Sequence, residues 1–126
     1  RQGFSALMKS ADLLLDTIGF SGFNTAMQAI GCGLPVITRE GEYMRTRHAS
    51  AILRILEIEE LIAKTETEYI DLVEKIVLDR EFLHNIKCKI KDKENYLYRN
   101  ENVIRALEKF FEGVISDSLR SEVQIN

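Results

Sequence analysis

The sequence predicts an α/β fold built on a parallel sheet, and two observations support this prediction. Short apolar runs at 13–15, 35–38 and 61–63 have the length of strands, and stretches with helical periodicity separate them. Strands that alternate with helices are joined by crossovers and therefore lie parallel in one sheet. The 126 residues, 45% of them hydrophobic and 29% charged, suit one domain with a single core.

The chain is predicted to open with a helix followed by a strand. Apolar side chains recur at helical spacing across residues 2–10, which favours a short helix. Three consecutive leucines at 13–15, bounded by polar residues, are typical of a strand that is buried on both faces. The next residues, 16–22, include two glycines and other turn-forming side chains. We therefore expect a loop between this strand and the next helix.

A second helix and a second strand are predicted between residues 23 and 38. The helix at 23–32 has mainly small apolar side chains, which allow a helix to approach a sheet closely. Gly33 is suited to end this helix because it can adopt the left-handed conformation. Pro35 then begins a strand at 35–38, at a position where a strand needs no backbone donor.

The middle of the chain is predicted to add a charged loop, two helices and an edge strand. Residues 39–43 form the loop, and residues 44–56 place apolar side chains on one stripe of a helix. The short apolar run at 61–63 is expected to be a brief edge strand. Thr67 is expected to begin an amphipathic helix that continues to Val77, with acidic residues near its positive end.

From Arg80 onward the pattern is almost wholly helical. One side of the first stretch is apolar and the other carries most of the lysines, which we interpret as a solvated face and not as a binding patch. A last helix is expected at 101–115, followed by a flexible tail at 116–126. The predicted architecture is a partial Rossmann-like three-layer α/β/α sandwich with short parallel strands and a helical C-terminal region.

The sequence also predicts that residues 1–115 form only part of a domain. Three strands make a narrow sheet, whereas a free-standing doubly wound domain has about five or six. The chain opens on Arg1, in the middle of the pattern and without an initiator Met. We therefore expect the missing strands to precede Arg1.

Composition argues against several classes of function. The formal net charge of −3, with acids and bases interleaved, gives no broad positive field for nucleic acid or anionic lipid. No apolar run has the length of a membrane span. Cys32 and Cys88 have neither the density of a disulfide scaffold nor a metal-binding spacing. We therefore expect a cytoplasmic protein with reduced thiols that binds no nucleic acid.

The strand, glycine-containing loop and helix between residues 11 and 35 form the stretch most informative about function. The first amide protons of a helix lack intrahelical partners, so such a helix start is suited to bind phosphate. Ligands of parallel sheets bind beyond the carboxyl ends of the strands, which puts the loops 17–24 and 38–47 on one rim. The amides from Gly22 to Thr25 are therefore candidates to bind an anion. In an alternative interpretation, the Asn24 and Thr25 side chains only cap the helix.

Several segments, taken together, resemble a known family. They are ADLLLDT at 11–17, Asn24 and Thr25 after the glycine-containing loop, GLPVIT at 33–38, GE(x)4R at 41–47 and ELIAKTETEYIDLV at 60–73. Their order and spacing resemble the C-terminal, nucleotide-sugar-binding half of GT-B glycosyltransferases, in particular the O-GlcNAc transferase family and its bacterial relatives. The resemblance extends over about residues 4–90.

The resemblance implies roles for individual residues. Phe23, Asn24 and Thr25 match the positions that hold the diphosphate of a UDP-sugar donor, and Gln28 matches the position that binds the ribose. Arg47 matches the family's basic residue, and we expect it either to face the donor or to be solvated. The resemblance also implies that the catalytic base lies in an N-terminal GT-B domain, which this chain does not contain. No catalytic residue is therefore assigned within the chain.

Two departures from the family pattern affect the donor site. The family often has His where Phe23 stands, and this Phe removes a side-chain donor to phosphate. The family has Asp where Gln28 stands, and an amide offers the ribose one neutral acceptor in place of a carboxylate. Retaining GT-B families place two glutamates at the positions of Phe20 and Gln28, so their absence argues against retaining chemistry. Glu42 and His48 are weaker candidates for the site.

The function implied by the resemblance is the donor-binding part of an inverting glycosyltransferase. The implied substrates are a UDP-sugar, with GlcNAc or a hexose, and a protein or glycan acceptor, and no metal cofactor is expected. One alternative is a GT-B sugar-nucleotide epimerase or a glycan-polymerising transferase. Another is a degenerate GT-B module with a binding or scaffolding role, which the loss of a carboxylate at Gln28 favours.

Overall fold

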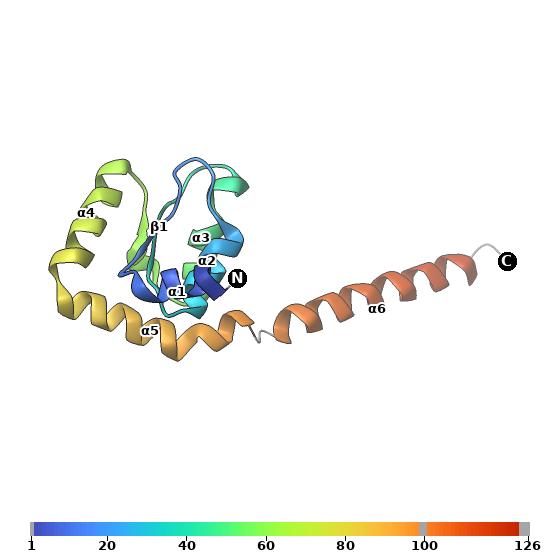
Figure 1. The fold of residues 1–126 in the computed structure, drawn as a ribbon. Helices are drawn as coiled ribbons and strands as arrows, with labels where there is room; N and C mark the ends of the chain where they lie inside the picture. The colour runs from blue at the N-terminus through green and yellow to red at the C-terminus, as the bar shows by residue number, and fades with distance from the viewer. Residues whose placement is uncertain (1, 99–100, 124–126) are drawn as a thin grey trace.

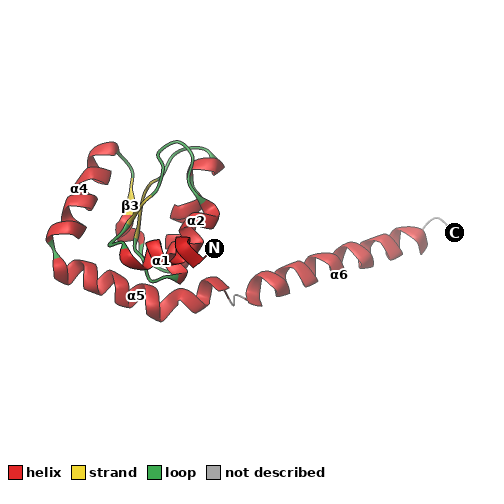
Figure 2. Ribbon diagram, in the orientation of Figure 1, coloured by secondary structure: helices red, strands yellow, loops and turns green. Residues whose placement is uncertain are grey.

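The computed structural model describes residues 2–98 and 101–123, and the predicted alternation of helices and strands is confirmed (Figures 1 and 2). The elements, in order, are α1 (Gln2–Ser10), β1 (Leu14–Leu15), α2 (Phe23–Gly31), β2 (Val36–Arg39), the 3-10 turn η1 (Met44–Thr46), α3 (His48–Ile55), the 3-10 turn η2 (Glu59–Leu61), β3 (Ile62–Ala63), α4 (Glu66–Leu78), α5 (Arg80–Tyr98) and α6 (Glu101–Val123).

The three strands form one parallel sheet, as predicted, and their order in it is β1-β2-β3. Val36 and Ile37 of the central strand are almost completely buried. The expectation that the first strand is buried on both faces is wrong, because Leu14 is only half-buried and Leu15 is 51% exposed. This strand has a hydrogen-bonded neighbour on one side only among the described residues, so its side chains are less covered than those of β2.

Helices cover both faces of the sheet, which gives three layers (Figure 1). Helices α2 and α3 pack on one face and α4 packs on the other. Helix α5 crosses below these layers, at the end of the sheet opposite the loops that follow β1 and β2. The core between the layers is aliphatic, and its most deeply buried large side chains include Ile30, Ile37, Leu53, Leu56, Ile58, Leu61, Ile76, Ile86 and Ile90.

Helix α5 is held to the other layers by apolar and polar contacts. Its buried side chains are Leu83, Ile86 and Ile90. The predicted solvated lysine face carries ion pairs from Lys89 to Glu60 and from Lys93 to Glu57. These pairs compensate two of the lysine charges and agree with our interpretation that the lysines are not a binding patch.

Several helix boundaries differ from those expected. The helix expected at 44–56 is divided into η1 and α3, because the backbone turns at Arg47 (φ −125°, ψ 3°). Helix α4 begins before Thr67, since the hydroxyl of Thr65 accepts the Glu68 amide at 3.1 Å and caps the helix. The expected left-handed conformation of Gly33 is confirmed, with φ of 73°.

Helix α6 extends away from the three layers and continues past the expected end at Ile115, to Val123 (Figure 1). The last part of the expected tail, residues 124–126, lies outside the described residues.

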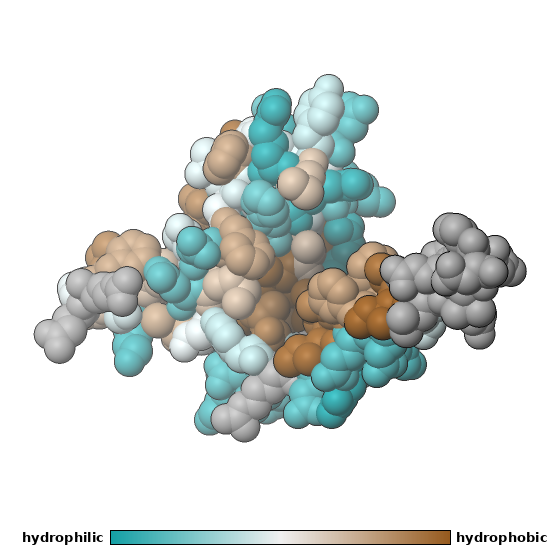
Figure 3. All heavy atoms as spheres, turned by 90° about the vertical axis from the view of Figure 1, so that its right-hand side faces the viewer, coloured by the Kyte–Doolittle hydropathy of each residue, from teal (hydrophilic) through white to brown (hydrophobic). Residues whose placement is uncertain are grey.

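All described side chains of α6, at 101–116, are exposed. Its large apolar side chains are Val103, Ile104, Leu107, Phe110, Phe111, Val114 and Ile115. Figure 3, viewed from the side to which α6 extends, shows hydrophobic side chains gathered beside hydrophilic ones. Among the described helices, none combines the length and apolar character that crossing a membrane requires.

Replacing Ile86 by Ala should lower the free energy of unfolding by about 3 kcal/mol, because this side chain is 1% exposed and its removal leaves a cavity. The matched control is Ile104→Ala on α6, where the side chain is 59% exposed and the change should stay within about 0.5 kcal/mol. Urea denaturation followed by circular dichroism measures both. Equal losses in the two variants would contradict the burial pattern described here.

Candidate functional site

The loops that follow β1 and β2 lie side by side at the carboxyl end of the sheet, as the sequence predicted (Figure 1). Ser21 joins them through its backbone and its side chain. Its amide donates to the Arg45 carbonyl at 2.8 Å, and its hydroxyl accepts the Ala49 amide at 2.9 Å. The start of α3 is therefore fixed next to the loop that leads into α2.

Asp16 is the buried centre of this rim. It follows β1 directly and is only 7% exposed. Its carboxylate accepts hydrogen bonds from the Ser21 hydroxyl at 2.7 Å, the Gly22 amide at 2.9 Å and the Thr38 hydroxyl at 2.7 Å. Three donors satisfy this buried anion, as a charge removed from water requires.

Tyr69 connects the same point to the opposite face of the sheet. Its hydroxyl donates to the backbone carbonyl of Asp16 at 3.0 Å. Burial, and then the negative charge of Asp16, raise the pKa of the Tyr69 phenol above its ordinary value. Helix α4 therefore holds the end of β1 through a phenol that stays protonated and donates.

The start of α2 differs in two respects from what the sequence suggested. The N-cap residue is Gly22, and no side chain caps the helix, so the interpretation that Asn24 and Thr25 cap it is wrong. The Gly22 amide already donates to Asp16, so this amide is not free for a ligand. The first helical amides, from Phe23 to Thr25, have no side-chain acceptor within the described part of the chain. These amides are the ones that remain suited to an anion.

The other candidate side chains of α2 are accessible. Phe23, Asn24, Thr25 and Gln28 are all exposed. Because Asn24 and Gln28 are four residues apart, they lie on the same face of the helix, one turn from each other. The Phe23 ring packs edge-on against the imidazole of His48, with ring centroids 5.8 Å apart and an interplanar angle of 71°. The structure thus brings His48 to the helix start.

Arg47 is held by an acidic side chain. Its Nε lies 3.5 Å from the Glu40 carboxylate, which also accepts two hydrogen bonds from Arg54, at 2.6 and 2.8 Å. The hydrogen bonds from Arg54 are the main reason that the pKa of Glu40 falls to about 2, and the Ser50 hydroxyl and the charge of Arg47 lower it further against the effect of burial. Arg47 therefore keeps an exposed guanidinium with a fixed anchor, whereas Glu42 is exposed.

Gly41 allows the second loop to close on itself. A Cβ atom at this position would lie 2.5 Å from the Thr46 hydroxyl oxygen and 2.9 Å from Thr46 Cβ. Thr46 cannot easily move away, because it is nearly buried and its hydroxyl donates to the Tyr43 carbonyl at 2.6 Å. The glycine of the GE(x)4R pattern thus has a packing role.

Sequence reasoning missed the residues that hold the rim together. Asp16, Ser21, Thr38 and Glu40 were not candidates, although Asp16 and Glu40 directly follow strands and polar residues at strand ends are a usable signal. Arg39, the last residue of the central strand, was also missed. Its Nε is buried and has no hydrogen-bond partner among the described residues.

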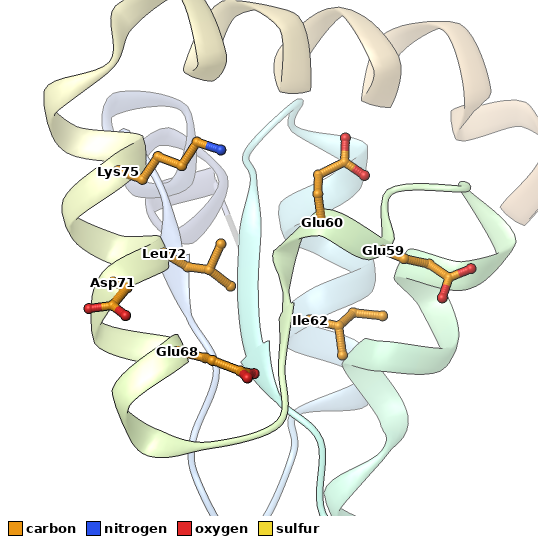
Figure 4. Close-up of a pocket in the computed structure, with 7 residues that line it drawn as sticks. All are labelled: Glu59, Glu60, Ile62, Glu68, Asp71, Leu72 and Lys75. Atoms are coloured by element: carbon orange, nitrogen blue, oxygen red, sulfur yellow. The ribbon is translucent and has the colours of Figure 1, made fainter.

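A pocket of about 300 Å³ lies elsewhere, between α4 and the η2–β3 segment (Figure 4). It is lined by Glu59, Glu60, Ile62, Glu68, Asp71, Leu72 and Lys75. Its acidic side chains are largely engaged with the protein, since Glu60 pairs with Lys89 and Glu68 accepts the Lys64 amide at 2.7 Å. Asp71 points away from β3 in Figure 4. None of the predicted site residues lines this pocket.

The described residues contain no cluster of three His, Cys, Asp or Glu side chains that could hold a metal ion. Both cysteines are free. The expectation that the site works without a metal cofactor stays a prediction.

Comparisons with known proteins agree with the resemblance. The model of the family described as Glycosyl transferase family 41 matches residues 6–103. The chain is 34% identical over 80 residues to the UDP-N-acetylglucosamine–peptide N-acetylglucosaminyltransferase of Caenorhabditis elegans. This match covers 64% of this chain and 7% of that protein. It is 25% identical over 81 residues to the probable enzyme of the same name, SPINDLY, of Petunia hybrida, covering 64% of this chain and 9% of that protein.

A solved structure is also similar. A mutant of the O-GlcNAc transferase of Thermobaculum terrenum superposes with a TM-score of 0.72 and 29% sequence identity. The match covers 84% of this chain and 22% of that one. The chain thus spans less than a quarter of this structure and less than a tenth of the two curated relatives.

Replacing Asp16 by Asn should lower the free energy of unfolding by about 3 kcal/mol, because one acceptor oxygen becomes a donor that faces other donors. Asp12→Asn is the matched control, since Asp12 is exposed and its replacement should change little. Thermal and urea denaturation of the two variants measure the difference. An Asp16→Asn protein as stable as the control would show that the buried hydrogen bonds do not hold the rim.

Glu40 should contribute stability that disappears in acid. Its pKa lies below the ordinary value of 4.5, at about 2, so its contribution is complete above pH 4.5 and is lost as the pH falls towards 2. Because both arginine partners are partly exposed, we expect about 1–2 kcal/mol at neutral pH. Urea denaturation of Glu40→Gln should show this loss at neutral pH and little loss near pH 2, whereas the exposed control Glu42→Gln should follow the unsubstituted chain at both.

Proposed function

Because this chain belongs to glycosyl transferase family 41, we propose that it is the nucleotide-sugar-binding part of a glycosyltransferase. The donor is a UDP-sugar, and the sugar passes to a protein or glycan acceptor. Relatives named as UDP-N-acetylglucosamine–peptide N-acetylglucosaminyltransferases favour GlcNAc and a protein acceptor among these possibilities.

The observation that carries this proposal is the uncapped start of α2 at the rim. The amides of Phe23, Asn24 and Thr25 have no side-chain acceptor among the described residues, and the three side chains are exposed. A diphosphate bound there gains both hydrogen bonds and the positive end of the helix dipole. The Thr25 hydroxyl adds a side-chain donor.

The remaining donor contacts follow from the arrangement around α2. Gln28, one turn further along the exposed face, offers an amide to the ribose hydroxyls. Arg47 presents its charge from the start of α3 while Glu40 fixes its position. Both residues approach the nucleotide from helices that the Asp16 hydrogen bonds hold together.

In this proposal the transfer is inverting and needs no metal. The acceptor hydroxyl attacks the anomeric carbon directly, the bond from that carbon to the diphosphate breaks, and the UDP that leaves keeps the electron pair. The α2 amides stabilise the negative charge that develops on the departing diphosphate. The base that takes the acceptor's proton belongs to a domain outside this chain.

A second candidate is a module that keeps the fold but has a binding or scaffolding role. Gln28 favours it, because a neutral amide binds a ribose diol less strongly than a carboxylate does. The two candidates differ in whether the rim recognises a nucleoside diphosphate.

Isothermal titration calorimetry of the full chain with UDP and with uridine distinguishes them. We expect UDP to bind and uridine to bind at least tenfold more weakly, because the helix start recognises the diphosphate. Thr25→Val removes a hydroxyl at almost constant volume and should weaken UDP binding about threefold to tenfold. The matched control, Thr67→Val on the exposed surface of α4, should bind UDP unchanged. Absence of UDP binding, or equal binding of UDP and uridine, would favour the scaffolding role.

A further inference from the structure

We propose that His48 is a further ligand of the donor: its protonated imidazole donates from Nε2 to an oxygen of the diphosphate, so that the imidazole takes up a proton when the nucleotide binds. This inference rests on the proposed function, since it concerns the same site. It assigns to a side chain of α3 a contact that the resemblance does not assign to this position.

The first step is the position of the ring. His48 is the first residue of α3, and its ring packs edge-on against Phe23, the first residue of α2. The two helix starts are joined by Ser21, whose hydroxyl accepts the Ala49 amide and whose carbonyl contacts the ring. The imidazole therefore lies beside the amides that we propose for the diphosphate.

The second step is the orientation of the ring. His48 Nδ1 lies 3.1 Å from the Ser21 carbonyl oxygen. Because a carbonyl oxygen can only accept, Nδ1 must carry a proton and donate it. In the neutral ring the proton is then on Nδ1 and absent from Nε2. Among the described residues nothing forms a hydrogen bond with Nε2.

The third step is the effect of an anion on this ring. A second proton, on Nε2, turns the imidazole into a cation with donors on both sides, one for Ser21 and one for a ligand. A diphosphate beside the ring favours this charged form. The charged side chains of the neighbouring segments are Asp16, Glu40, Glu42, Arg45 and Arg47; the two arginines oppose a second proton on the ring, and the carboxylates favour it. The Asp16 carboxylate is already occupied by three donors, so it does not compete for Nε2.

The side chain of Phe23 gives a further reason why the donor to the phosphate should come from His48 of α3. A phenylalanine at the first position of α2 gives a phosphate no side-chain donor, whereas the adjoining imidazole gives one. The edge-on contact with Phe23 and the hydrogen bond to Ser21 limit the rotation of the His48 ring. The His48 imidazole is thus held in place before the nucleotide binds.

Nitrogen spectra of the two histidines test the proposal directly. In long-range ¹H–¹⁵N spectra of the free chain, the neutral form of His48 should carry its proton on Nδ1. Addition of UDP should move both its nitrogens towards the values of a protonated ring. His84, an exposed residue of α5 and the only other histidine, serves as the internal control and should not change.

Calorimetry gives an independent measure. Binding heats of UDP in buffers of different ionisation enthalpy should report proton uptake by the unsubstituted chain. His48→Asn keeps an N–H group near the position of Nδ1 for the Ser21 carbonyl but has nothing at the position of Nε2. This variant should bind UDP about tenfold more weakly and lose the proton uptake, whereas His84→Asn should behave as the unsubstituted chain does.

The outcomes separate this inference from the proposed function. If UDP binds while the His48 nitrogens keep their free values, or if His48→Asn binds as tightly with the same proton uptake, the role of His48 is overturned and the donor site stands. If UDP does not bind to the unsubstituted chain, both fail. The nitrogen spectra use the unsubstituted chain, so they decide the matter even if the variant does not fold.

Discussion

The geometry of the rim depends on one buried carboxylate. Asp16 receives hydrogen bonds from the loop before α2, from the amide that precedes this helix and from the central strand. Without these bonds nothing in the aliphatic core would define how the two loops meet, because apolar packing is not directional. A buried charge with satisfied donors is costly to rearrange, so it specifies one arrangement of the loops.

The same carboxylate determines where a ligand can contact α2. The Asp16 carboxylate accepts the hydrogen bond of the Gly22 amide, so this amide is not available to a ligand. Among the described residues, the amides without a side-chain acceptor begin one residue later, at Phe23. The starts of α2 and α3 then present amides, an imidazole and a guanidinium to the same rim. The guanidinium of Arg47 is paired with the Glu40 carboxylate, which fixes its position at this rim.

The fold was more predictable from the sequence than the site. Apolar periodicity located the helices and the three strands, because burial of a stripe or a run depends on local spacing. The division at Arg47 was not predictable, since the carbonyls of Arg45 and Thr46 before it accept hydrogen bonds from the Ser21 and Gly41 amides, and apolar periodicity carries no signal of such bonds. The residue types at the start of α2 were recognisable from the sequence. The hydrogen bond from the Gly22 amide to Asp16 was not, because these residues come close only in the folded loop. His48 was a weak candidate because its neighbour Phe23 is distant in sequence.

The hydrogen bond from the Tyr69 hydroxyl to the Asp16 carbonyl has a consequence for the kinetics of folding. It closes a loop of more than fifty residues, whereas the bond from the Thr38 hydroxyl to the Asp16 carboxylate closes one of about twenty. A longer loop closes later, because more chain entropy is lost before the contact that stabilises the closed loop can form. The two loops of the rim should therefore reach their final conformation only when α4 packs on the sheet. During synthesis on the ribosome, β1, α2 and β2 would emerge before α4 and before the rim can bind a ligand.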